Sequence, residues 1–217
     1  LVCPASPAAL AIHDSAAHLT LSDGRRIETR LIVAADGRDS WVRQAAGIGA
    51  RNTPYGEKGV VANFRCEKPH RDTAFQWFRK DGVLAYLPLP DQHMSMVWSA
   101  PDALADELVA LSPEALCAKV AEAGEHRLGA LTPVTPAAAF PLRLMRVDSA
   151  VQPRLALIGD AAHAIHPLSG HGINLGYQDA CALAEQLAAL PAWRDPGELL
   201  VLRAYARARA EETALLQ

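Results

Sequence analysis

Residues 156–187, ALIGDAAHAIHPLSGHGINLGYQDACALAEQL, run from an apolar strand through a loop into a long amphipathic helix. The strand, at residues 155–158, leads directly into Gly159 and Asp160. Glycine lets the backbone approach a ligand closely, and the first N–H groups of a helix have no partner within it. This order of strand, glycine-rich turn and helix start predicts a site for a phosphate, a ribityl chain or an anionic ring edge.

A shorter stretch near the start of the chain has the same order of elements. The apolar run at 31–35 predicts a strand buried on both faces of a parallel sheet, and Asp36-Gly37 ends it. Ser40 then begins a short helix that carries Arg43, a residue placed to reach a diphosphate. An ordinary strand-to-helix turn explains these residues equally well when the stretch is taken alone.

Between these stretches the chain changes character. Residues 59–99 predict four strands with short links, which form an antiparallel sheet, and helices follow at 102–110 and 113–122. An extended segment at 137–147 and helices at 172–190 and 198–216 complete the pattern. We therefore predict an α/β chain with a sheet domain inserted between two parts of a ligand-binding domain, divided as 1–50, 51–150 and 151–217.

The composition excludes several classes of protein. Of 217 residues, 50% are hydrophobic and 21% charged, and the net charge of −3 gives no electrostatic reason to bind nucleic acid or an anionic membrane. Four widely separated cysteines predict reduced, mostly buried thiols in a cytoplasmic protein. No apolar run is long enough to span a membrane and no signal peptide is visible. Because the first residue is Leu1, we expect a piece of a longer protein.

The long loop offers more than one chemistry. The Asp160 carboxylate can accept hydrogen bonds from sugar or ribityl hydroxyls, or it can cap a turn. Gly170 and Gly172 permit a close backbone approach just where the helix dipole favours an anionic ring edge. The simpler alternative is a tight loop whose Gly176 allows close helix packing.

Other polar and aromatic residues have simpler interpretations. His163 and His166 have a spacing that could bind a metal, but Pro167 breaks a helix there and we expect no metal site. Three arginines of the last helix are expected on a solvated face: Arg203, Arg207 and Arg209. The aromatic residues of the inserted sheet are expected mainly in its core: Phe64, Phe75, Trp77, Phe78, Tyr86 and Trp98.

Two quoted motifs resemble a known family. ADGRDSWVRQAAGI (35–48) and the segment 159–187 resemble the Asp-Gly and Gly-Asp motifs of the group A FAD-dependent aromatic hydroxylases, which have the fold of para-hydroxybenzoate hydroxylase. YGEKGVVANFRCEKPH and AFQWFRKDGVLAYLPLP resemble the ubiquinone-biosynthesis branch. The resemblance covers nearly the whole chain. It implies a partial FAD-binding Rossmann-like domain with an inserted substrate domain of mixed or antiparallel sheet.

The resemblance also implies an activity, in which FAD, NAD(P)H and dioxygen hydroxylate a (poly)prenylated phenol. Asp160, next to Gly159, would hold the ribityl chain of FAD, and Pro167 would shape the substrate side of the ring. The backbone facing the pyrimidine edge of the ring would come from five consecutive residues: Gly170, His171, Gly172, Ile173 and Asn174. The dinucleotide site, used by FAD and NAD(P)H, would include Asp36, Gly37 and Arg43. No catalytic acid or base stands out.

Two departures from the family keep other functions open. The family begins with a unit that carries GxGxxG and holds the FAD diphosphate, and this sequence contains none; His171 stands where the ubiquinone branch usually has Gln. One alternative is therefore a non-catalytic scaffold that retains a lipid- or partner-binding sheet domain. Another is a flavin reductase or halogenase, although residues 75–78 only approximate the halogenase pattern Trp-x-Trp-x-Ile-Pro.

The resemblance implies partners and a location as well. We expect a homo-oligomer or a member of a ubiquinone-biosynthesis complex, with no nucleic acid bound. The protein would be cytoplasmic, with at most peripheral contact with the inner membrane.

Overall fold

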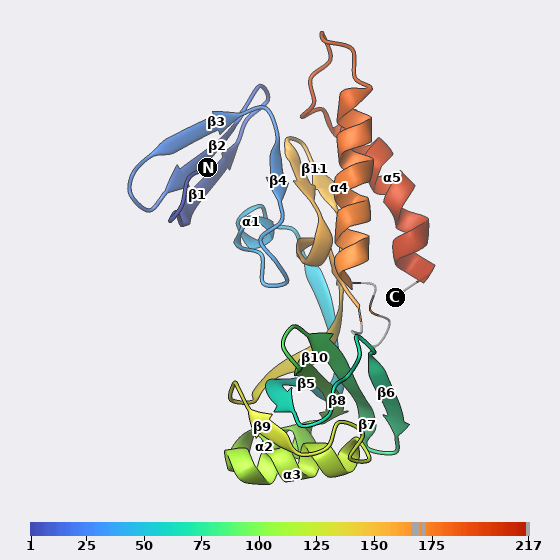
Figure 1. The fold of residues 1–217 in the computed structure, drawn as a ribbon. Coiled ribbons are helices and arrows are strands. Elements are labelled where there is room, and N and C mark those ends of the chain that lie inside the picture. Colours follow the sequence, from blue (N-terminus) through green and yellow to red (C-terminus); the bar gives the residue numbers. More distant parts are fainter. Residues whose placement is uncertain (166–169, 171, 216–217) are drawn as a thin grey trace. The chain divides into compact units, whose positions relative to one another are not determined.

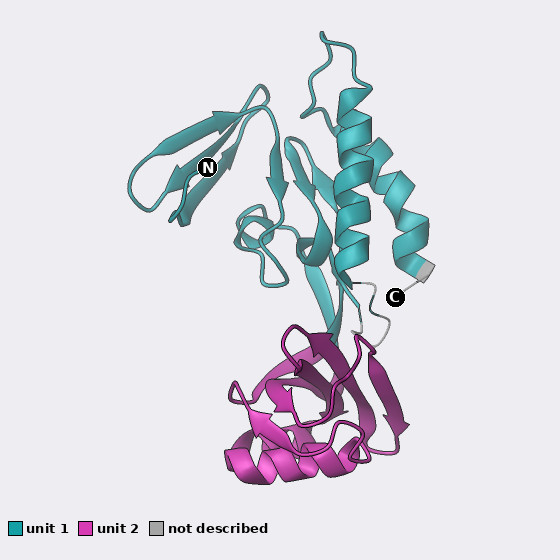
Figure 2. Ribbon diagram, viewed as in Figure 1, with its two compact units in different colours: residues 1–53, 143–217 teal, residues 54–142 magenta. Residues whose placement is uncertain are grey.

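The computed structural model describes residues 1–165, 170 and 172–215. The chain forms two compact units, one of Leu1–Thr53 and Arg143–Gln217 and the other of Pro54–Leu142 (Figure 2). Helices and strands occur in both, so the α/β class is confirmed. The three-part division at residues 50 and 150 stays a prediction about domains. In the described part of the chain, no helix is long and apolar enough to cross a membrane.

The first unit begins with an antiparallel meander (Figure 1). Its strands are β1 (Pro7–Ile12), β2 (Ala17–Leu21) and β3 (Arg26–Thr29). The turn between β2 and β3 contains Asp23-Gly24, and Gly24 has a φ of +88°, a left-handed conformation that favours glycine. An Asp-Gly dipeptide is typical of such a hairpin turn.

A small sheet of mixed direction lies at the centre of the first unit. It has the order β11-β12-β4, with β4 at Ile32–Ala34, β11 at Val151–Gln152 and β12 at Leu155–Leu157. Strands β12 and β4 run parallel, whereas β11 and β12 form an antiparallel hairpin. All three residues of β12 are buried, but Val33 of β4 is 41% exposed, so the prediction that this strand is buried on both faces is wrong for Val33.

The helices of the first unit follow the strands at the predicted places. Helix α1 (Trp41–Ala45) begins after Ser40, whose hydroxyl accepts a hydrogen bond from the Arg43 N–H. A short 3₁₀ turn (Gly159–Ala161) and strand β13 (His163–Ala164) come next after β12. Helices α4 (Gly172–Ala188) and α5 (Leu199–Leu215) lie side by side (Figure 1).

A buried arginine joins three separate parts of the first unit. The Arg154 guanidinium donates to the carbonyl oxygens of His13 (3.0 Å) and Arg30 (2.9 Å) and pairs with the Asp195 carboxylate (2.5 Å). These partners lie in the β1–β2 turn, after β3, and between α4 and α5. One side chain thus connects the meander with the segment between the two long helices.

The second unit contains the antiparallel sheet predicted for the middle of the chain. Its strand order is β10-β5-β8-β7-β6, with β9 paired to β5. The strands are β5 (Ala50–Cys66), β6 (Phe75–Arg79), β7 (Gly82–Leu89), β8 (His93–Pro101), β9 (Leu131–Pro133) and β10 (Ala138–Val147). Helices α2 (Asp102–Ala110) and α3 (Pro113–Ala123) cover one face of this sheet (Figure 1).

The core of the second unit is built from large side chains. Phe64, Tyr86 and Trp98 are almost fully buried, and the Tyr86 hydroxyl donates to the carbonyl oxygen of Val120 in α3 at 2.5 Å. Phe75 and Trp77 pack against this core while partly exposed, but Phe78 is 80% exposed. The prediction that these aromatic residues form the core is therefore confirmed except for Phe78.

The cysteines divide evenly between the interior and the surface. All four are free; Cys66 and Cys117 are buried, while Cys3 and Cys181 are exposed. Burial raises the pKa of both buried thiols, which keeps them protonated and unreactive. The prediction of mostly buried thiols holds for this buried pair only.

The start of α3 offers a test of local helix stability. The Ser112 hydroxyl accepts a hydrogen bond from the Ala115 N–H at 3.2 Å, and Pro113 follows it. Ser112→Ala should lower the free energy of unfolding by about 1 kcal/mol, because one N–H of the first turn loses its partner. Urea denaturation followed by circular dichroism measures this, and Ser112→Asp, which keeps an acceptor, should stay near the wild type. Equal midpoints for the Ala and Asp variants would contradict the cap.

Candidate functional site

The two predicted ligand motifs meet at one edge of the central sheet. In the parallel pair, Leu157 of β12 lies opposite Ala34 of β4, so both strands end at the same level. The Ile158 N–H continues the pairing by donating to the carbonyl oxygen of Ala34 at 3.0 Å. Asp36 and Gly159 each follow their strand by two residues, although more than one hundred residues separate them in the sequence. The carboxyl ends of parallel strands are the usual place for a ligand in open α/β folds.

Asp36 organises the turn that follows β4. Its carboxylate accepts hydrogen bonds from the Ser40 hydroxyl (2.6 Å) and from the Val42 N–H (3.0 Å). Gly37 has a φ of +84°, a left-handed conformation that favours glycine. These contacts match the structural interpretation of the Asp-Gly motif; its part in dinucleotide binding stays a prediction.

Arg43 connects the two motifs. Its side chain is buried, and Nη1 donates to the carbonyl oxygen of Ala161 at 3.0 Å. Ala161 belongs to the 3₁₀ turn that contains Asp160. Arg43 therefore fixes the Gly-Asp motif from the side of the Asp-Gly motif, whereas its contact with a diphosphate stays a prediction.

A buried carboxylate holds the Gly-Asp motif from the opposite side. Asp179 of α4 is 1% exposed, and one of its oxygens accepts from the Gly159 N–H (2.9 Å) and contacts His163 Nε2 (2.7 Å). Its other oxygen accepts from Arg209 Nε of α5 at 2.8 Å. Partners from the 3₁₀ turn, from β13 and from α5 thus converge on one side chain of α4.

These contacts stabilise the negative charge of the buried Asp179 carboxylate. Burial by itself raises the pKa of Asp179, but hydrogen bonds from His163 and Arg209 outweigh it and hold the pKa below its ordinary value near 3.8. Nearby, the Tyr205 hydroxyl donates to the carbonyl oxygen of Leu157 at 2.9 Å. Burial raises the pKa of Tyr205, so this hydroxyl remains a donor.

The glycines of the site fall into two groups. Gly159 has a φ of +57°, and a Cβ at Gly176 would lie 3.3 Å from the Gly159 Cα, so strand end and helix touch through backbone. By contrast, a Cβ built at Gly170 or Gly172 would meet no described atom within 4 Å. Gly176 therefore serves close packing, as the simpler interpretation predicted, whereas a side chain at the start of α4 would enter open space that no described atom fills.

The residues expected to contact a ligand lie around that open space. The Asp160 side chain is exposed, and so are Ile173 (69%) and Asn174 in the first turn of α4. This turn contains no acidic residue, so none of its described side chains offsets the positive end of the helix dipole. Pro167 and His171 lie outside the described residues.

The expected absence of a metal site at the histidine pair stays a prediction, because only His163 of the pair is described. His163 is buried against Asp179, and no group of three or more potential metal ligands occurs among the described residues. His166 lies outside them.

Sequence reasoning missed Asp179 and misplaced Arg209. Arg209 is buried and bound to Asp179, so its predicted place on a solvated face is wrong, although Arg203 and Arg207 are exposed as expected. A signal did exist: Leu175, Asp179 and Leu183 are spaced by four residues, and all three are buried. A charged residue on the apolar stripe of a helix needs a buried partner.

Comparison with known proteins identifies this arrangement. Residues 13–215 match the FAD binding domain family, whose match includes both motifs and both long helices. The chain belongs to this family. Because the family binds FAD, FAD is the ligand to test at the start of α4 and at the exposed Asp160 carboxylate.

Several similar sequences carry names from ubiquinone biosynthesis. The chain is 39% identical to ubiquinone hydroxylase UbiL of Rhodospirillum rubrum over 217 residues, which is 100% of this chain and 51% of the relative. It is also 39% identical to 3-demethoxyubiquinol 3-hydroxylase of Escherichia coli, covering 99% of this chain and 55% of that protein. The chain thus spans about half the length of these relatives.

A solved structure agrees with the fold. Pseudomonas aeruginosa PqsL, determined in complex with 2-aminobenzoylacetate, superposes with a TM-score of 0.81 at 26% identity, over 98% of this chain and 60% of that one. The resemblance to group A flavin monooxygenases is therefore confirmed at the level of sequence and fold.

The residues present fit one part of FAD. An exposed carboxylate suits ribityl hydroxyls, and the N–H groups of an open helix start suit the electron-rich pyrimidine edge of the ring. The described residues offer no comparable glycine-rich helix start for a second, diphosphate group, because α1 is short and its first turn is capped by Asp36 and Ser40.

The Asp179 contacts predict a specific pH dependence of stability. Because the pKa of Asp179 is lower in the folded than in the unfolded chain, its contribution is complete above about pH 4 and is lost as pH falls through the folded pKa. Asp179→Asn should cost about 3–5 kcal/mol near neutral pH, since it leaves buried Arg209 without a charged partner. Thermal unfolding from pH 7 to pH 2 should show a smaller acid-induced loss for this variant.

The matched control for that experiment is Asp14→Asn, which changes an exposed carboxyl without a side-chain contact to a described residue. It should keep the wild-type profile. If Asp179→Asn had the same stability and the same acid slope as the wild type, the role assigned to Asp179 would be wrong.

The two groups of glycines should respond differently to added side chains. Gly176→Val should destabilise the protein by about 1–3 kcal/mol, because the new side chain pushes against the Gly159 backbone. Gly172→Ala should leave the melting temperature unchanged or higher, since no described atom lies within 4 Å of the added Cβ and Ala favours helix. Differential scanning calorimetry compares the two; a larger loss for Gly172→Ala would reverse the assignment.

Proposed function

We propose that this chain forms the flavin-facing and substrate-binding part of an FAD-dependent monooxygenase that hydroxylates a prenylated phenol in ubiquinone biosynthesis. The observation that carries the proposal is the exposed Asp160 carboxylate beside an open, glycine-lined start of α4, at the carboxyl edge of a parallel strand pair. The similarity to ubiquinone hydroxylases supports the choice of substrate class.

The residues of the Gly-Asp motif would bind and orient the cofactor. Asp160 would accept hydrogen bonds from the ribityl hydroxyls, and the N–H groups at Gly172 and Ile173 would face the pyrimidine edge. The positive end of the α4 dipole would stabilise negative charge on the reduced ring. When bound, FAD supplies the chemistry that transfers reducing equivalents from NAD(P)H and uses dioxygen for hydroxylation.

The inserted sheet offers a surface suited to an apolar substrate. Side chains alternate along its strands, so the residues next to the buried ones face away from α2 and α3. On that face Val61, Val97 and Ala85 lie opposite one another across β5, β8 and β7. Phe78 and Leu87 of the same face are 80% and 42% exposed. We propose that this strip contacts the aromatic ring or the prenyl chain.

The cosubstrate and assembly follow from the same proposal. Asp36, Gly37 and Arg43 would serve the dinucleotide site shared by FAD and NAD(P)H, beside the structural contacts they make here. The protein would act in the cytoplasm as a homo-oligomer or within a ubiquinone-biosynthesis complex, with at most peripheral contact with the inner membrane.

A non-catalytic scaffold is the second candidate, because the sequence contains no GxGxxG segment. The absorbance spectrum of the purified chain separates the two. Flavin bands at near-stoichiometric occupancy, or saturable binding of added FAD, would support the flavoprotein and exclude the scaffold. A colourless chain that fails to bind FAD would exclude catalysis by this chain.

Asp160 provides the residue-level test of cofactor binding. Asp160→Ala should weaken FAD affinity about 10-fold or more, which corresponds to roughly 1.5–3 kcal/mol for a hydrogen bond to a charged group. Fluorescence quenching of FAD measures the affinity, and Asp14→Ala, another exposed aspartate, is the matched control. Equal affinities for both variants would remove Asp160 from the site.

Gly172→Ala extends this test, because it should weaken FAD binding without lowering the melting temperature. The substrate class is tested by incubating the protein with FAD, NAD(P)H, dioxygen and a prenylated phenol. A hydroxylated product in mass spectrometry would support the class, whereas NAD(P)H consumption that yields only hydrogen peroxide would count against it.

A further inference from the structure

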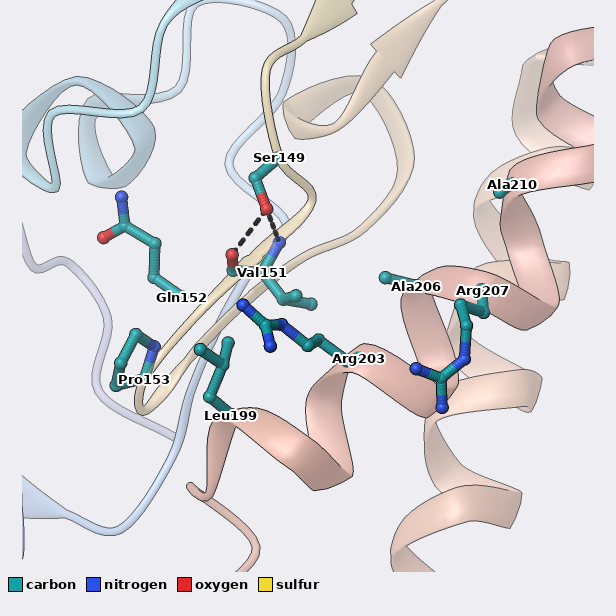
Figure 3. A pocket seen from close by; sticks show the side chains of 9 residues that line it. All are labelled: Ser149, Val151, Gln152, Pro153, Leu199, Arg203, Ala206, Arg207 and Ala210. Atoms are coloured by element: carbon teal, nitrogen blue, oxygen red, sulfur yellow. Dashed lines mark hydrogen bonds between the residues drawn. The ribbon is translucent and has the colours of Figure 1, made fainter.

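Two adjoining cavities lie beside α5 in the first unit, and the lining of the first contains no residue of the Gly-Asp motif. One cavity of about 370 Å³ opens between α5 and the β11 hairpin (Figure 3). Its walls are Ser149, Val151, Gln152 and Pro153 on one side and Leu199, Arg203, Ala206, Arg207 and Ala210 on the other. A second cavity of about 350 Å³ adjoins it and shares Ser149, Ala206 and Ala210. Together they form a groove along α5, which we call the α5 groove.

The α5 groove carries a surplus of positive charge in a chain of net charge −3. Four arginines line it, Arg146, Arg203, Arg207 and Arg209, against two aspartates, Asp148 and Asp179. Arg209 and Asp179 are bound to each other. Asp148 lies so close to Gly49 that a Cβ added to Gly49 would stand 2.1 Å from the Asp148 Oδ2. The first cavity has no acidic residue in its lining.

Three of these arginines have no partner in the described part of the chain. The side chains of Arg146, Arg203 and Arg207 make no hydrogen bond or ion pair with a described residue, and Glu211, four residues after Arg207, does not pair with it. Arg203 and Arg207 are four residues apart on one helix face, a spacing at which like charges destabilise a helix. An anion between them would turn this repulsion into attraction.

The form of the groove indicates the class of anion. Figure 3 shows the Arg203 side chain extending from α5 toward Val151 of the hairpin, with Leu199 beside it. Val151, Leu199 and Ala206 provide apolar surface next to the guanidinium groups, which limits the water that competes with a bound ligand. Guanidinium groups bind phosphate oxygens in bidentate geometry, and two of them match a group with two negative charges.

We propose that the α5 groove is an anion site for a phosphate group attached to an apolar or aromatic body. Arg203 and Arg207 hold the phosphate, and the surface of Val151, Leu199 and Ala206 receives the attached body. The cavity that holds Arg203 and Arg207 shares no lining residue with the Gly-Asp motif, and the proposal does not depend on the proposed function. A soluble phosphate ester and a lipid headgroup share this chemistry.

The test uses pyrophosphate as the probe and calorimetric titration at low salt as the measurement. The wild type should bind it saturably, and the double variant Arg203→Gln/Arg207→Gln should bind at least about 10-fold more weakly. The matched control Arg51→Gln/Arg65→Gln removes the same charge from two exposed arginines outside the groove and should change the affinity less than about twofold. Absence of saturable binding to the wild type, or equal binding by the double variant, would overturn the proposal.

Melting temperatures show whether the variant is folded. Without ligand, the double variant should melt at or above the wild-type temperature, because a like-charge pair has been removed. Pyrophosphate should raise the melting temperature of the wild type and the control but not of the double variant. A variant that no longer binds FAD would place these arginines in the flavin site and would also overturn the proposal.

Vesicles identify the source of the phosphate. Cosedimentation with phosphatidylcholine vesicles that contain phosphatidic acid, lost in the double variant, would assign the groove to a lipid headgroup. Pyrophosphate binding without cosedimentation would assign it to a soluble phosphate ester.

Discussion

The geometry of the candidate site depends on the buried Asp179 carboxylate. A buried carboxylate is stable only when hydrogen-bond donors surround it. The loss of one donor therefore destabilises the whole arrangement. Those partners are the N–H of Gly159, the ring of His163 and the guanidinium of Arg209. The end of β12, the following turn and the packing of α4 on α5 are therefore coupled through one side chain, and a change in any of them is transmitted to the residues around Asp160.

The parallel pairing of β4 with β12 supplies the other constraint. It brings the two motifs to one sheet edge although the whole second unit is inserted between them in sequence. Arg43 then bridges them through the Ala161 carbonyl. The site is thus assembled from long-range contacts, while each motif is also stabilised locally, as the Asp36 hydrogen bonds show. Asp36 and Arg43 can therefore be needed both for folding and for ligand binding.

Sequence patterns predicted the features that depend on neighbouring residues in the chain, such as helix starts and buried strands. The helix that begins after Ser112 and the apolar strand at 155–158 follow from capping and burial preferences, and the structure contains both. The partners of Arg209 and the exposure of Val33 could not be predicted in this way, because they depend on which surfaces other segments cover. A residue type indicates that a partner is needed; only the tertiary fold decides which one.

The contact between Gly159 and Gly176 has a consequence for how the site can change. Because two backbones meet there directly, the ends of the intervening segment are held together by packing, in addition to the hydrogen bond between the Gly159 N–H and Asp179. Much of the entropic cost of closing that segment is met by the scaffold before any ligand arrives. Exposed residues next to this contact, such as Asp160 and Asn174, can therefore change what is recognised while the frame keeps its stability.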